Sequence, residues 1–520
     1  MIALLKKLQS PRWWIPALAL WLAATAGVRP LMLPDEGRYA GIAWEMASAG
    51  NWALPLLDGM PFFHKPPLFY WIDAFAITLF GGHPWAARLA SVIGAVAAVA
   101  ALFLFLRRYA SPRLATMASL VLVTQPFFFV GAQFANLDML VAGMISATIL
   151  AGAGALLRHE RGETWRAAAA LTFALAALGV LAKGLIGIVL PGGVLLLWVL
   201  WRRRWRSLPL LVWPVGLVVF AAIALPWFLL MQRTYPGFFD YFVVYHHFQR
   251  FSQTGFNNQM PLWFYVPVIA LLALPWTLWL FRLFRRSYWR SEAQAPLRSL
   301  MAIWLLLILV FFSLPSSKLV GYILPVLPPV AFFVAEPFLQ WCERAAVRGR
   351  RWFGITLATA TVTCVALVVG VRLADKVSAR PLAEIVRPAF AAEDQLVMVD
   401  RYQYDLPFYL HTIRPAWVLS DWDDPTIPER DNWRKELFDA GQFDGVTSAR
   451  VLLTPARFAA RMCEEHTGSL WVWGTGDAPA LLPVLSGLAP YAAEGKYVVW
   501  RLTPEALSQL PACAGRPRGG

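Results

Sequence analysis

Long apolar segments separated by short polar connections fill the first three quarters of the chain. A helix needs about 20 consecutive apolar residues to span a bilayer. Eleven segments approach that length: 13–33, 84–106, 113–131, 138–157, 167–182, 184–201, 208–231, 262–284, 297–314, 319–341 and 352–373. A further run, 66–81, is short and carries Asp73 beside aromatic residues, which is typical of a helix lying in the membrane interface. The pattern predicts an α-helical polytopic membrane protein.

The last quarter of the chain has a different pattern. Short apolar runs such as Leu396–Val399 alternate with helical patterns such as 453–463, and this alternation is typical of a small soluble α/β domain. We therefore expect two domains. The first is a membrane domain over residues 1–375, whose external loop 34–83 contains interfacial helices, and the second is a soluble domain over residues 376–520.

Composition supports a membrane protein and argues against a nucleic-acid-binding one. The 520 residues are 58% hydrophobic and only 15% charged, and the mean hydropathy is +0.54. The net charge is +15, a value that nucleic-acid-binding proteins also reach. Here, however, the basic residues form short clusters between apolar segments, such as Arg202–Arg204. Cytoplasmic loops of membrane proteins have this composition, so we expect no nucleic-acid partner.

The same charges predict the topology. Lys6, Lys7 and Arg12 indicate a cytoplasmic N-terminus. With eleven spans, alternation then makes every strongly basic connection cytoplasmic and leaves the part after about residue 374 outside. No small-residue cleavage site follows the first apolar segment, so we expect this segment to be a retained helix rather than a cleaved signal peptide.

Four cysteines add a prediction about redox state. They are Cys342, Cys364, Cys463 and Cys513, and no pair has the spacing of metal ligands. In the expected topology only Cys463 and Cys513 lie in the external domain, where an oxidising compartment allows disulfides to persist. We therefore expect a Cys463–Cys513 disulfide, and the alternative is that one or both are buried free thiols.

Charged residues gather on the external face of the predicted membrane domain. The first external loop begins with Pro34–Tyr39, which contains two adjacent carboxylates and an arginine. The topology brings the following residues to this face: Asp35, Glu36, Arg38, Lys65, Asp138, Lys183, His246, His247, Arg250 and Lys318. Charges at a membrane are costly unless they serve a function. Cations that hold a phosphate and a carboxylate that acts on the reacting group would suit an anionic substrate with a lipid tail.

Each of these residues also has a purely structural interpretation. A single interfacial lysine is commonly an anchor whose ammonium reaches the aqueous boundary. Asp35 and Asp138 each precede or begin a predicted helix and could cap it. The functional interpretation depends on the coincidence of many charges on one face.

The motifs themselves resemble a known family. Residues 35–40, 45–52 and 63–71 are similar to the first periplasmic loop of the bacterial aminoarabinose transferase family, which belongs to the C-type glycosyltransferase (GT-C) superfamily. Protein O-mannosyltransferases are more distant relatives. Further stretches fit the same pattern: Asn136–Asp138, Leu181–Gly184, His247–Phe251 and Ser317–Pro325. The resemblance extends from residue 1 to about 340.

This resemblance implies a fold and an activity. The implied fold is GT-C, with about 11–13 transmembrane helices, interfacial helices in the first external loop, and a periplasmic α/β domain. The implied donor is a sugar carried on undecaprenyl phosphate, such as 4-amino-4-deoxy-L-arabinose, and the implied acceptor is lipid A or a related envelope molecule. The enzyme would be a monomer in the bacterial inner membrane, in contact with membrane lipids.

The resemblance also implies roles for individual residues. The catalytic residues would be Asp35, Arg38 and Asp138. The donor phosphate would be bound by Lys65, Lys183, Arg250, Lys318 and Tyr322. Glu36 and Tyr39 would line the substrate cavity.

The sequence departs from the family at two positions. His64 and His246 stand where the family usually has glutamate. In the family, a Glu and a His can hold a zinc ion, and His64 with His247 is the candidate pair here because both are good zinc ligands. No other cofactor is expected, and none is required for the reaction.

Two other activities compete with transfer of aminoarabinose. One is transfer of a hexose or mannose from a polyprenyl phosphate to protein or another glycan. The other is transport of an anionic lipid, for which repeat symmetry and charges near the middle of helices are typical. Because the charges cluster at one face, the sequence favours an inverting glycosyltransferase, in which an acceptor oxygen attacks the sugar C1 and the polyprenyl phosphate leaves.

Overall fold

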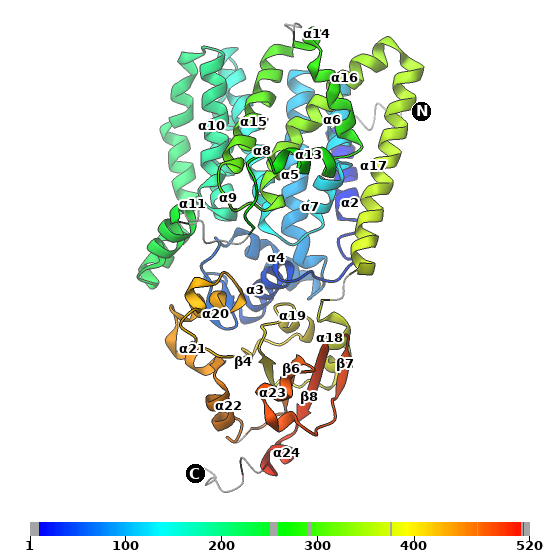
Figure 1. Ribbon diagram of the computed structural model, residues 1–520. Helices are drawn as coiled ribbons and strands as arrows, with labels where there is room; N and C mark the ends of the chain where they lie inside the picture. Colours follow the sequence, from blue (N-terminus) through cyan, green and yellow to red (C-terminus); the bar gives the residue numbers. More distant parts are fainter. Residues whose placement is uncertain are drawn as a thin grey trace. The chain divides into compact units, whose positions relative to one another are not determined.

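The computed structural model describes residues 10–249, 258–289, 294–374, 377–464, 466–510 and 513 (Figure 1). Two compact units share the chain. The first contains Met1–Arg29, His64–Ile72 and Arg88–Leu373, and the second contains Pro30–Phe63, Asp73–Ala87 and Ala374–Gly520. The expected domains divide near the same position, at 375/376, but most of the external loop packs with the C-terminal segment. The assignment of loop 34–83 to the catalytic domain stays a prediction.

The first unit is built from apolar helices. In the described ranges, seven helices are long and apolar enough to cross a membrane: Ala86–Tyr109, Leu137–Glu160, Arg166–Lys183, Trp205–Thr234, Ala295–Ser313, Val320–Arg344 and Ala346–Ala374. Two bent pairs raise this number to nine. Pro112–Val123 and Pro126–Ala132 meet at 69°, and Tyr265–Leu272 and Trp276–Phe284 meet at 120°. The protein is thus a polytopic helical membrane protein.

The eleven expected spans exceed this number because apolar composition does not fix helix length. Two expected spans fall on shorter helices, α2 (Pro11–Ala23) and α10 (Ile186–Trp201). At 1.5 Å per residue these helices are roughly 20 and 24 Å long, and the hydrocarbon core is about 30 Å thick. The run 66–81, which was expected to lie in the interface, forms the short apolar helix α4 (Leu68–Phe80).

Helix α8 (Leu137–Glu160) is buried over nearly its whole length. It packs against α5 (Leu89–Tyr109) and against α9 (Arg166–Lys183) and α10. Glycines allow these helices to approach closely. A Cβ at Gly143 of α8 would lie 2.7 Å from the Cα of Gly94 on α5. Small residues at such crossings are the usual means by which membrane helices pack.

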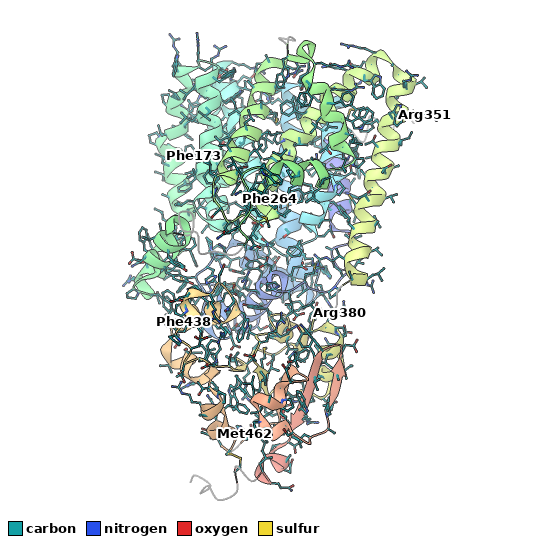
Figure 2. All side chains as sticks on the ribbon, in the orientation of Figure 1. Phe173, Phe264, Arg351, Arg380, Phe438 and Met462 are labelled. Carbon is teal, nitrogen blue, oxygen red and sulfur yellow. A yellow bond between two sulfur atoms is a disulfide. The ribbon has the colours of Figure 1, made fainter. Side chains whose placement is uncertain are left out.

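Larger side chains fill the other helix contacts of this unit. Phe173 of α9, labelled in Figure 2, packs against Gly216 of α11 (Pro214–Thr234), where an added Cβ would overlap the Phe173 ring. Arg298 of α15 (Ala295–Ser313) forms a buried ion pair with Glu336 of α16 (Leu327–Arg344), with 2.5 Å between Nη2 and Oε1. The remaining elements of this unit are α6 (Pro112–Val123), α7 (Pro126–Ala132), η2 (Trp205–Val212), η3 (Asp240–Gln249), α13 (Tyr265–Leu272), η4 (Trp276–Phe284), α14 (Arg286–Trp289), η6 (Val320–Val326) and α17 (Ala346–Ala374).

The second unit contains a six-stranded sheet in the order β5-β4-β3-β6-β8-β7. Its strands are β3 (Gln395–Val399), β4 (Trp417–Leu419), β5 (Leu452–Leu453), β6 (Leu470–Thr475), β7 (Ala492–Glu494) and β8 (Tyr497–Leu502). Strands β3 to β6 are parallel, whereas β8 is antiparallel to β6 and to β7. Strand β3 is buried at every position, as expected for a parallel strand covered on both faces. The predicted C-terminal α/β domain is confirmed.

Short helices cover this sheet. They are α18 (Arg380–Val386), η7 (Arg387–Ala389), α19 (Leu406–Leu410), η8 (Ile427–Glu429), α20 (Trp433–Gly441), α21 (Gly445–Val451), α22 (Pro455–Arg461), α23 (Ala478–Leu481), η9 (Pro483–Leu485) and α24 (Pro504–Ser508). Met462, labelled in Figure 2, is buried in the same core as Trp417, Phe458 and Trp500.

The predicted disulfide is present in this unit. Cys463, after α22, is bonded to Cys513, after α24, and the two Cα atoms are 5.1 Å apart. Both cysteines pack against the core of the sheet domain. Cys342 and Cys364 are free thiols.

The N-terminal part of the second unit consists of a helix and a hairpin. Helix α3 (Asp35–Ala49) is followed by β1 (Leu56–Leu57) and β2 (Met60–Pro61). Asp58 and Gly59 form the two-residue turn, and their φ angles are 55° and 77°. Such a turn requires two positive φ angles, which an Asp-Gly pair adopts readily. Helix α3 packs on α19, and β2 packs on α20.

Candidate functional site

In the first unit, three predicted site residues lie together at the ends of helices. Asp138, in the first turn of α8, forms an ion pair with Lys183, the last residue of α9. The Lys183 ammonium also lies 4.3 Å from the centre of the Tyr322 ring. Asn136 caps α8 by accepting the N–H of Asp138 at 3.0 Å. A carboxylate at a helix N-terminus and an ammonium at a C-terminus each have a favourable interaction with the helix dipole.

Gly321 gives Asp138 the space that it occupies. A Cβ at position 321 would lie 3.0 Å from Asp138 Cγ and closer still to one carboxylate oxygen. The same residues, together with Phe312 and Pro325, line a small cavity of about 10 Å³. The Asp138–Lys183 pair is therefore largely screened from solvent, and it borders a cavity about the size of one water molecule.

Lys318 has a different environment. Its side chain is 3% exposed, and its ammonium donates to the carbonyl of Met260 at 2.8 Å and to that of Pro315. Its own N–H donates to the carbonyl of Asn258 at 3.1 Å. Burial lowers the pKa of the Lys318 ammonium below its usual value. In this structure Lys318 links the connection that contains Asn258 and Met260 to the connection that contains Pro315. Its role as a phosphate ligand stays a prediction.

The remaining predicted residues of the first unit are only partly described. His64 and Lys65 are half-buried, and the His64 ring lies 5.9 Å from the ring of Tyr241. Arg250 and the side chain of His247 lie outside the described residues. The described part of the chain contains no group of three or more His, Cys, Asp or Glu residues that could hold a metal ion. The zinc site, of which one candidate ligand is described, stays a prediction.

In the second unit, Asp35 and Arg38 lie one turn apart on α3. Arg38 Nη2 is 2.5 Å from Asp35 Oδ1, and Nη1 pairs with Glu436 of α20. The Tyr404 hydroxyl donates to the other oxygen of Glu436 at 2.5 Å. Burial opposes the charge of Arg38, but Glu436, Tyr39 and Asp35 outweigh this effect and raise the pKa of the guanidinium. Arg38 is thus held as a fixed cation between two carboxylates.

Glu36 and Tyr39, which were predicted to line a substrate cavity, are both buried. Glu36 Oε2 accepts the N–H of Met32 at 2.8 Å, so this carboxylate holds the chain just before α3. The Tyr39 ring lies 5.2 Å from the Arg38 guanidinium carbon. Both residues therefore support the segment that positions Asp35 and Arg38, and their contact with a substrate stays a prediction.

Sequence reasoning missed Glu436 and Tyr404. Glu436 is 398 positions from Arg38, and nothing in the pattern of its short helix distinguishes it from an ordinary surface glutamate. A basic residue in a buried position requires an acidic partner, and this requirement was the only available signal.

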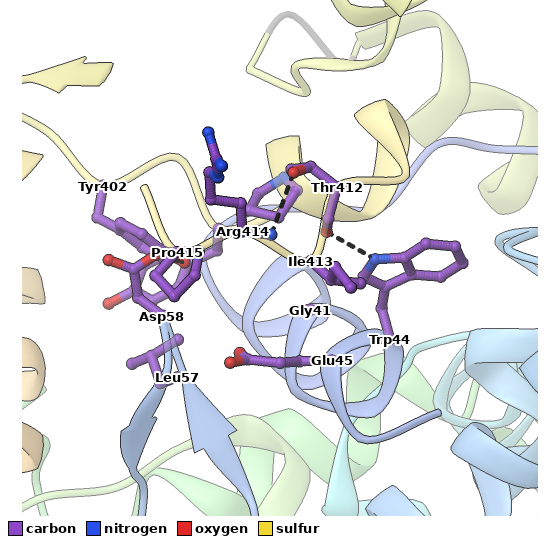
Figure 3. A pocket seen from close by; sticks show the side chains of 12 residues that line it. Gly41, Trp44, Glu45, Leu57, Asp58, Tyr402, Thr412, Ile413, Arg414 and Pro415 are labelled. Atoms are coloured by element: carbon purple, nitrogen blue, oxygen red, sulfur yellow. Dashed lines mark hydrogen bonds between the residues drawn. The ribbon is translucent and has the colours of Figure 1, made fainter. Parts of the chain in front are cut away.

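A second acidic pair, also missed, lies in a pocket of the same unit (Figure 3). Glu45 Oε1 accepts the N–H of Gly59 at 2.8 Å. Asp58 Oδ1 accepts the N–H of Ala416 at 2.7 Å and is 3.5 Å from the Tyr402 hydroxyl. Burial raises the pKa of Glu45 to about 7 and raises that of Asp58 well above its usual value, and the charge of Glu45 adds to the shift of Asp58. Asp58 thus attaches the hairpin turn to the C-terminal segment, and Glu45 attaches the same turn to α3.

Comparison with known proteins shows which families the chain resembles. The family described as dolichyl-phosphate-mannose-protein mannosyltransferase matches residues 64–228. The chain is 32% identical over 332 residues to undecaprenyl phosphate-alpha-4-amino-4-deoxy-L-arabinose arabinosyl transferase 2 of Pseudomonas fluorescens, a match that covers 63% of this chain and 60% of that protein. It is 31% identical over 443 residues to the corresponding transferase of Pseudomonas aeruginosa, which covers 82% of this chain and 77% of the relative.

Solved structures show the same fold. The crystal structure of ArnT from Cupriavidus metallidurans bound to undecaprenyl phosphate aligns with a TM-score of 0.75 and 24% identity, over 94% of this chain and 97% of that one. The archaeal oligosaccharyltransferase AglB from Archaeoglobus fulgidus aligns with a TM-score of 0.52 and 13% identity, over 96% and 77%. The expected GT-C fold is confirmed. With 31% identity over 77% of the length of the Pseudomonas aeruginosa protein, the chain belongs to the family of undecaprenyl phosphate-aminoarabinose arabinosyl transferases.

Proposed function

We propose that this protein is a membrane glycosyltransferase that moves a sugar, 4-amino-4-deoxy-L-arabinose, from undecaprenyl phosphate to lipid A or a related envelope acceptor. The observation that carries the proposal is the match with the Pseudomonas aeruginosa arabinosyl transferase over 443 residues. The ArnT fold supports it, and so do the cations and carboxylates at the helix ends of the first unit.

The chemistry requires only that charge be stabilised where it develops. The acceptor oxygen attacks C1 of the sugar, the C1–O bond to the phosphate breaks, and the bonding electrons leave with undecaprenyl phosphate. Because this leaving group is already a stabilised anion, fixed cations aid the step more than a proton donor does. Lys65, Lys183, Lys318 and Arg250 are the proposed phosphate ligands. When the acceptor is a hydroxyl, Asp35 would take its proton.

The ion pair of Asp138 with Lys183 gives a route for donor binding. The ammonium is charge-paired and sits against Tyr322, so an arriving phosphate would compete with Asp138 for the same cation. A phosphate that displaces the carboxylate leaves Asp138 available to a second group, such as the incoming acceptor or the amine of an amino sugar. This exchange would keep the partly buried Lys183 paired with an anion both with and without the donor.

The proposed location is the bacterial inner membrane, with the N-terminus in the cytoplasm and the C-terminal domain in the periplasm. The basic connections support this orientation through the charge bias of cytoplasmic loops. The Cys463–Cys513 disulfide also supports it, because structural disulfides persist in the periplasm and rarely in the cytosol.

Transfer can be measured directly. Purified protein is incubated with undecaprenyl phosphate-aminoarabinose and lipid A, and both lipids are followed by mass spectrometry. Asp35→Asn should lose transfer while the protein still folds, since the change removes charge at nearly constant shape. Asp423→Asn, which changes an exposed aspartate of the same unit, should remain active. Near-normal turnover by Asp35→Asn would exclude a catalytic role for Asp35, and lipid movement across liposomes without transfer would favour a transporter.

A second candidate is transfer of mannose or another hexose to protein. The match of residues 64–228 to the protein mannosyltransferase family favours it. The same assay with a polyprenyl-phosphate mannose donor and an acceptor peptide distinguishes the two: a mannosylated peptide together with unmodified lipid A would support the second candidate.

A further inference from the structure

The sheet of the second unit has a topological switch point between β3 and β6. From β3 the chain proceeds outward to β4 and then to β5, and it returns to β6 on the other side of β3. The connections on the two sides therefore leave the carboxyl ends of β3 and β6 in opposite directions. In open α/β sheets, ligands bind in the crevice that this divergence creates.

A pocket lies at this position. Residues that follow β3 and residues at the end of β6 line it, and β8 contributes a tyrosine. The polar lining side chains are those of Asp400, Arg401, Gln403, Trp473, Thr475, Asp477 and Tyr497. Its cavity volume is about 160 Å³. A cavity of about 150 Å³ can hold one benzene ring, so the space suits a ligand with a single six-membered ring.

Three buried polar atoms of this pocket have no hydrogen-bond partner among the described residues. They are Gln403 Oε1, Trp473 Nε1 and Tyr497 Oη, and the three residues are 1%, 3% and 5% exposed. Nearly all buried polar atoms in proteins are hydrogen-bonded. Three exceptions around one pocket indicate that a ligand, rather than the protein, supplies their partners.

The fold sets the orientation of these groups. Gln403 Nε2 donates to the carbonyl of Val377 at 3.1 Å, which fixes the amide plane and leaves Oε1 for another donor. In the β6–β8 register Thr475 is opposite Tyr497 and Trp473 is opposite Val499, so Trp473 and Tyr497 share one face of the sheet. Their ring centres are 5.7 Å apart. Burial raises the pKa of Tyr497, and a weak interaction with the neighbouring Gln403 side chain lowers it, but the Tyr497 hydroxyl has no partner in hydrogen-bond geometry among the described residues.

The chemistry of the lining narrows the class of ligand. The pocket offers an acceptor at Gln403 and donors at Trp473 and Tyr497, so the ligand must both donate and accept hydrogen bonds. The lining contains two carboxylates, Asp400 and Asp477, and one cation, Arg401, and this acidic excess disfavours phosphates and nucleotides. Hydroxyl groups donate and accept equally well, and aromatic rings offer apolar surface to the C–H faces of a ring.

We propose that this pocket binds a carbohydrate unit of monosaccharide size, through Gln403, Trp473 and Tyr497. The site lies wholly within the C-terminal segment and is separate from the groups assigned to transfer. It goes beyond the proposed function, since transfer from a lipid carrier needs no second sugar site. A sugar bound there would be a glycan unit of an envelope molecule on which the domain docks.

Ligand-observed NMR on the purified full-length protein tests this proposal without using the transfer reaction. D-Glucose, D-galactose and N-acetyl-D-glucosamine are each added alone, and saturation transfer from protein to sugar is measured. At least one of them should bind. Tyr497→Phe and Gln403→Leu should each weaken this binding about tenfold, since each removes one hydrogen bond. Tyr491→Phe, the same change at a half-exposed tyrosine outside the pocket, should leave binding unchanged.

Stability in the absence of sugar provides the second readout. Tyr497→Phe removes an oxygen that has no protein partner, so the melting temperature should stay the same or rise. A clear fall would mean that the oxygen has a structural partner and would overturn the proposal. The absence of binding by all three sugars would overturn it as well, as would binding that survives both pocket substitutions or is displaced by inorganic phosphate. A failed transfer assay leaves this result unaffected, so the two hypotheses can fail independently.

Discussion

At the scale of single residues, several charges that are partly or fully buried in this protein occur in pairs of opposite sign. Asp138 with Lys183 and Arg38 with Glu436 each neutralise a charge that would be costly alone. A buried pair is weak evidence for stability, because desolvation offsets the attraction, but removal of one partner is strongly destabilising. A double variant, in which both partners are replaced, can therefore distinguish a structural role of the pair from a functional one.

Single substitutions of the Asp138–Lys183 pair should be destabilising. Asp138→Asn and Lys183→Met should each lower the free energy of unfolding by about 3 kcal/mol, since each leaves one uncompensated charge. The double variant should recover most of this loss but should not recover transfer, because the phosphate ligand is gone. Thermal unfolding in detergent and the mass-spectrometric assay give the two readouts. Full activity of the double variant would make the pair purely structural.

The Glu45–Asp58 pair predicts a pH dependence of stability. The pKa of Glu45 rises from 4.5 to about 7 on folding, so the folded state binds more protons than the unfolded state between these values. The contribution of Glu45 to the free energy of unfolding is fully present below pH 4.5 and is lost as pH rises through about 7. Each pKa unit corresponds to 1.36 kcal/mol, so the free energy of unfolding falls by about 3 kcal/mol over this range. Asp58, which is shifted in the same direction, adds to it.

Unfolding of the second unit, measured between pH 5 and pH 8, tests this dependence. Glu45→Gln should flatten the profile and raise stability at pH 8, because the neutral amide needs no proton. Glu429→Gln, at an exposed position, should keep the profile of the unmodified protein. An unchanged slope in Glu45→Gln would assign the dependence to other groups.

At the scale of secondary-structure elements, the membrane unit depends on the close crossing of α5 and α8. Gly143→Ala should lower the free energy of unfolding by about 1–3 kcal/mol, because its methyl group would meet backbone atoms of Gly94 that have no room to move. Gly370→Ala is the matched control. In α17 no atom lies within 4 Å of an added Cβ at that position, so this change should be neutral or slightly stabilising. Equal melting temperatures for the two variants would contradict the packing argument.

Elements also show what sequence alone can predict. Apolar runs located the helices because only apolar segments are stable in lipid. They did not fix where a helix ends inside an apolar run, so α2 and α10 are shorter than their runs. The sequence could place Asp138, Lys183 and Tyr322 on the same face of the membrane domain, because each lies near the end of a predicted span. The partner of Arg38 could not be found, because Glu436 reaches it only through the tertiary fold.

At the scale of the whole molecule, the disulfide closes the C-terminal end of the sheet domain. Cys463 and Cys513 are 50 positions apart, and closing such a loop restricts the unfolded chain by about 4 kcal/mol in the chain-entropy model. Cys513→Ser should lower the unfolding midpoint of this domain, and a reductant should have the same effect on the unmodified protein. Cys342→Ser, which changes a free cysteine in the other unit, should leave the midpoint unchanged. Labelling of all four thiols without reductant would show that the bond does not form in solution.

The two outer strands of the sheet affect how readily copies of the protein aggregate. Strand β5 is two residues long and β7 is three. The open edge of a sheet is a template on which the strand of another molecule can pair, and proteins limit this hazard by keeping their outer strands short. Neither edge here offers enough backbone for a lasting ladder. Copies of this protein can therefore crowd together in one membrane without their sheets joining into a continuous aggregate.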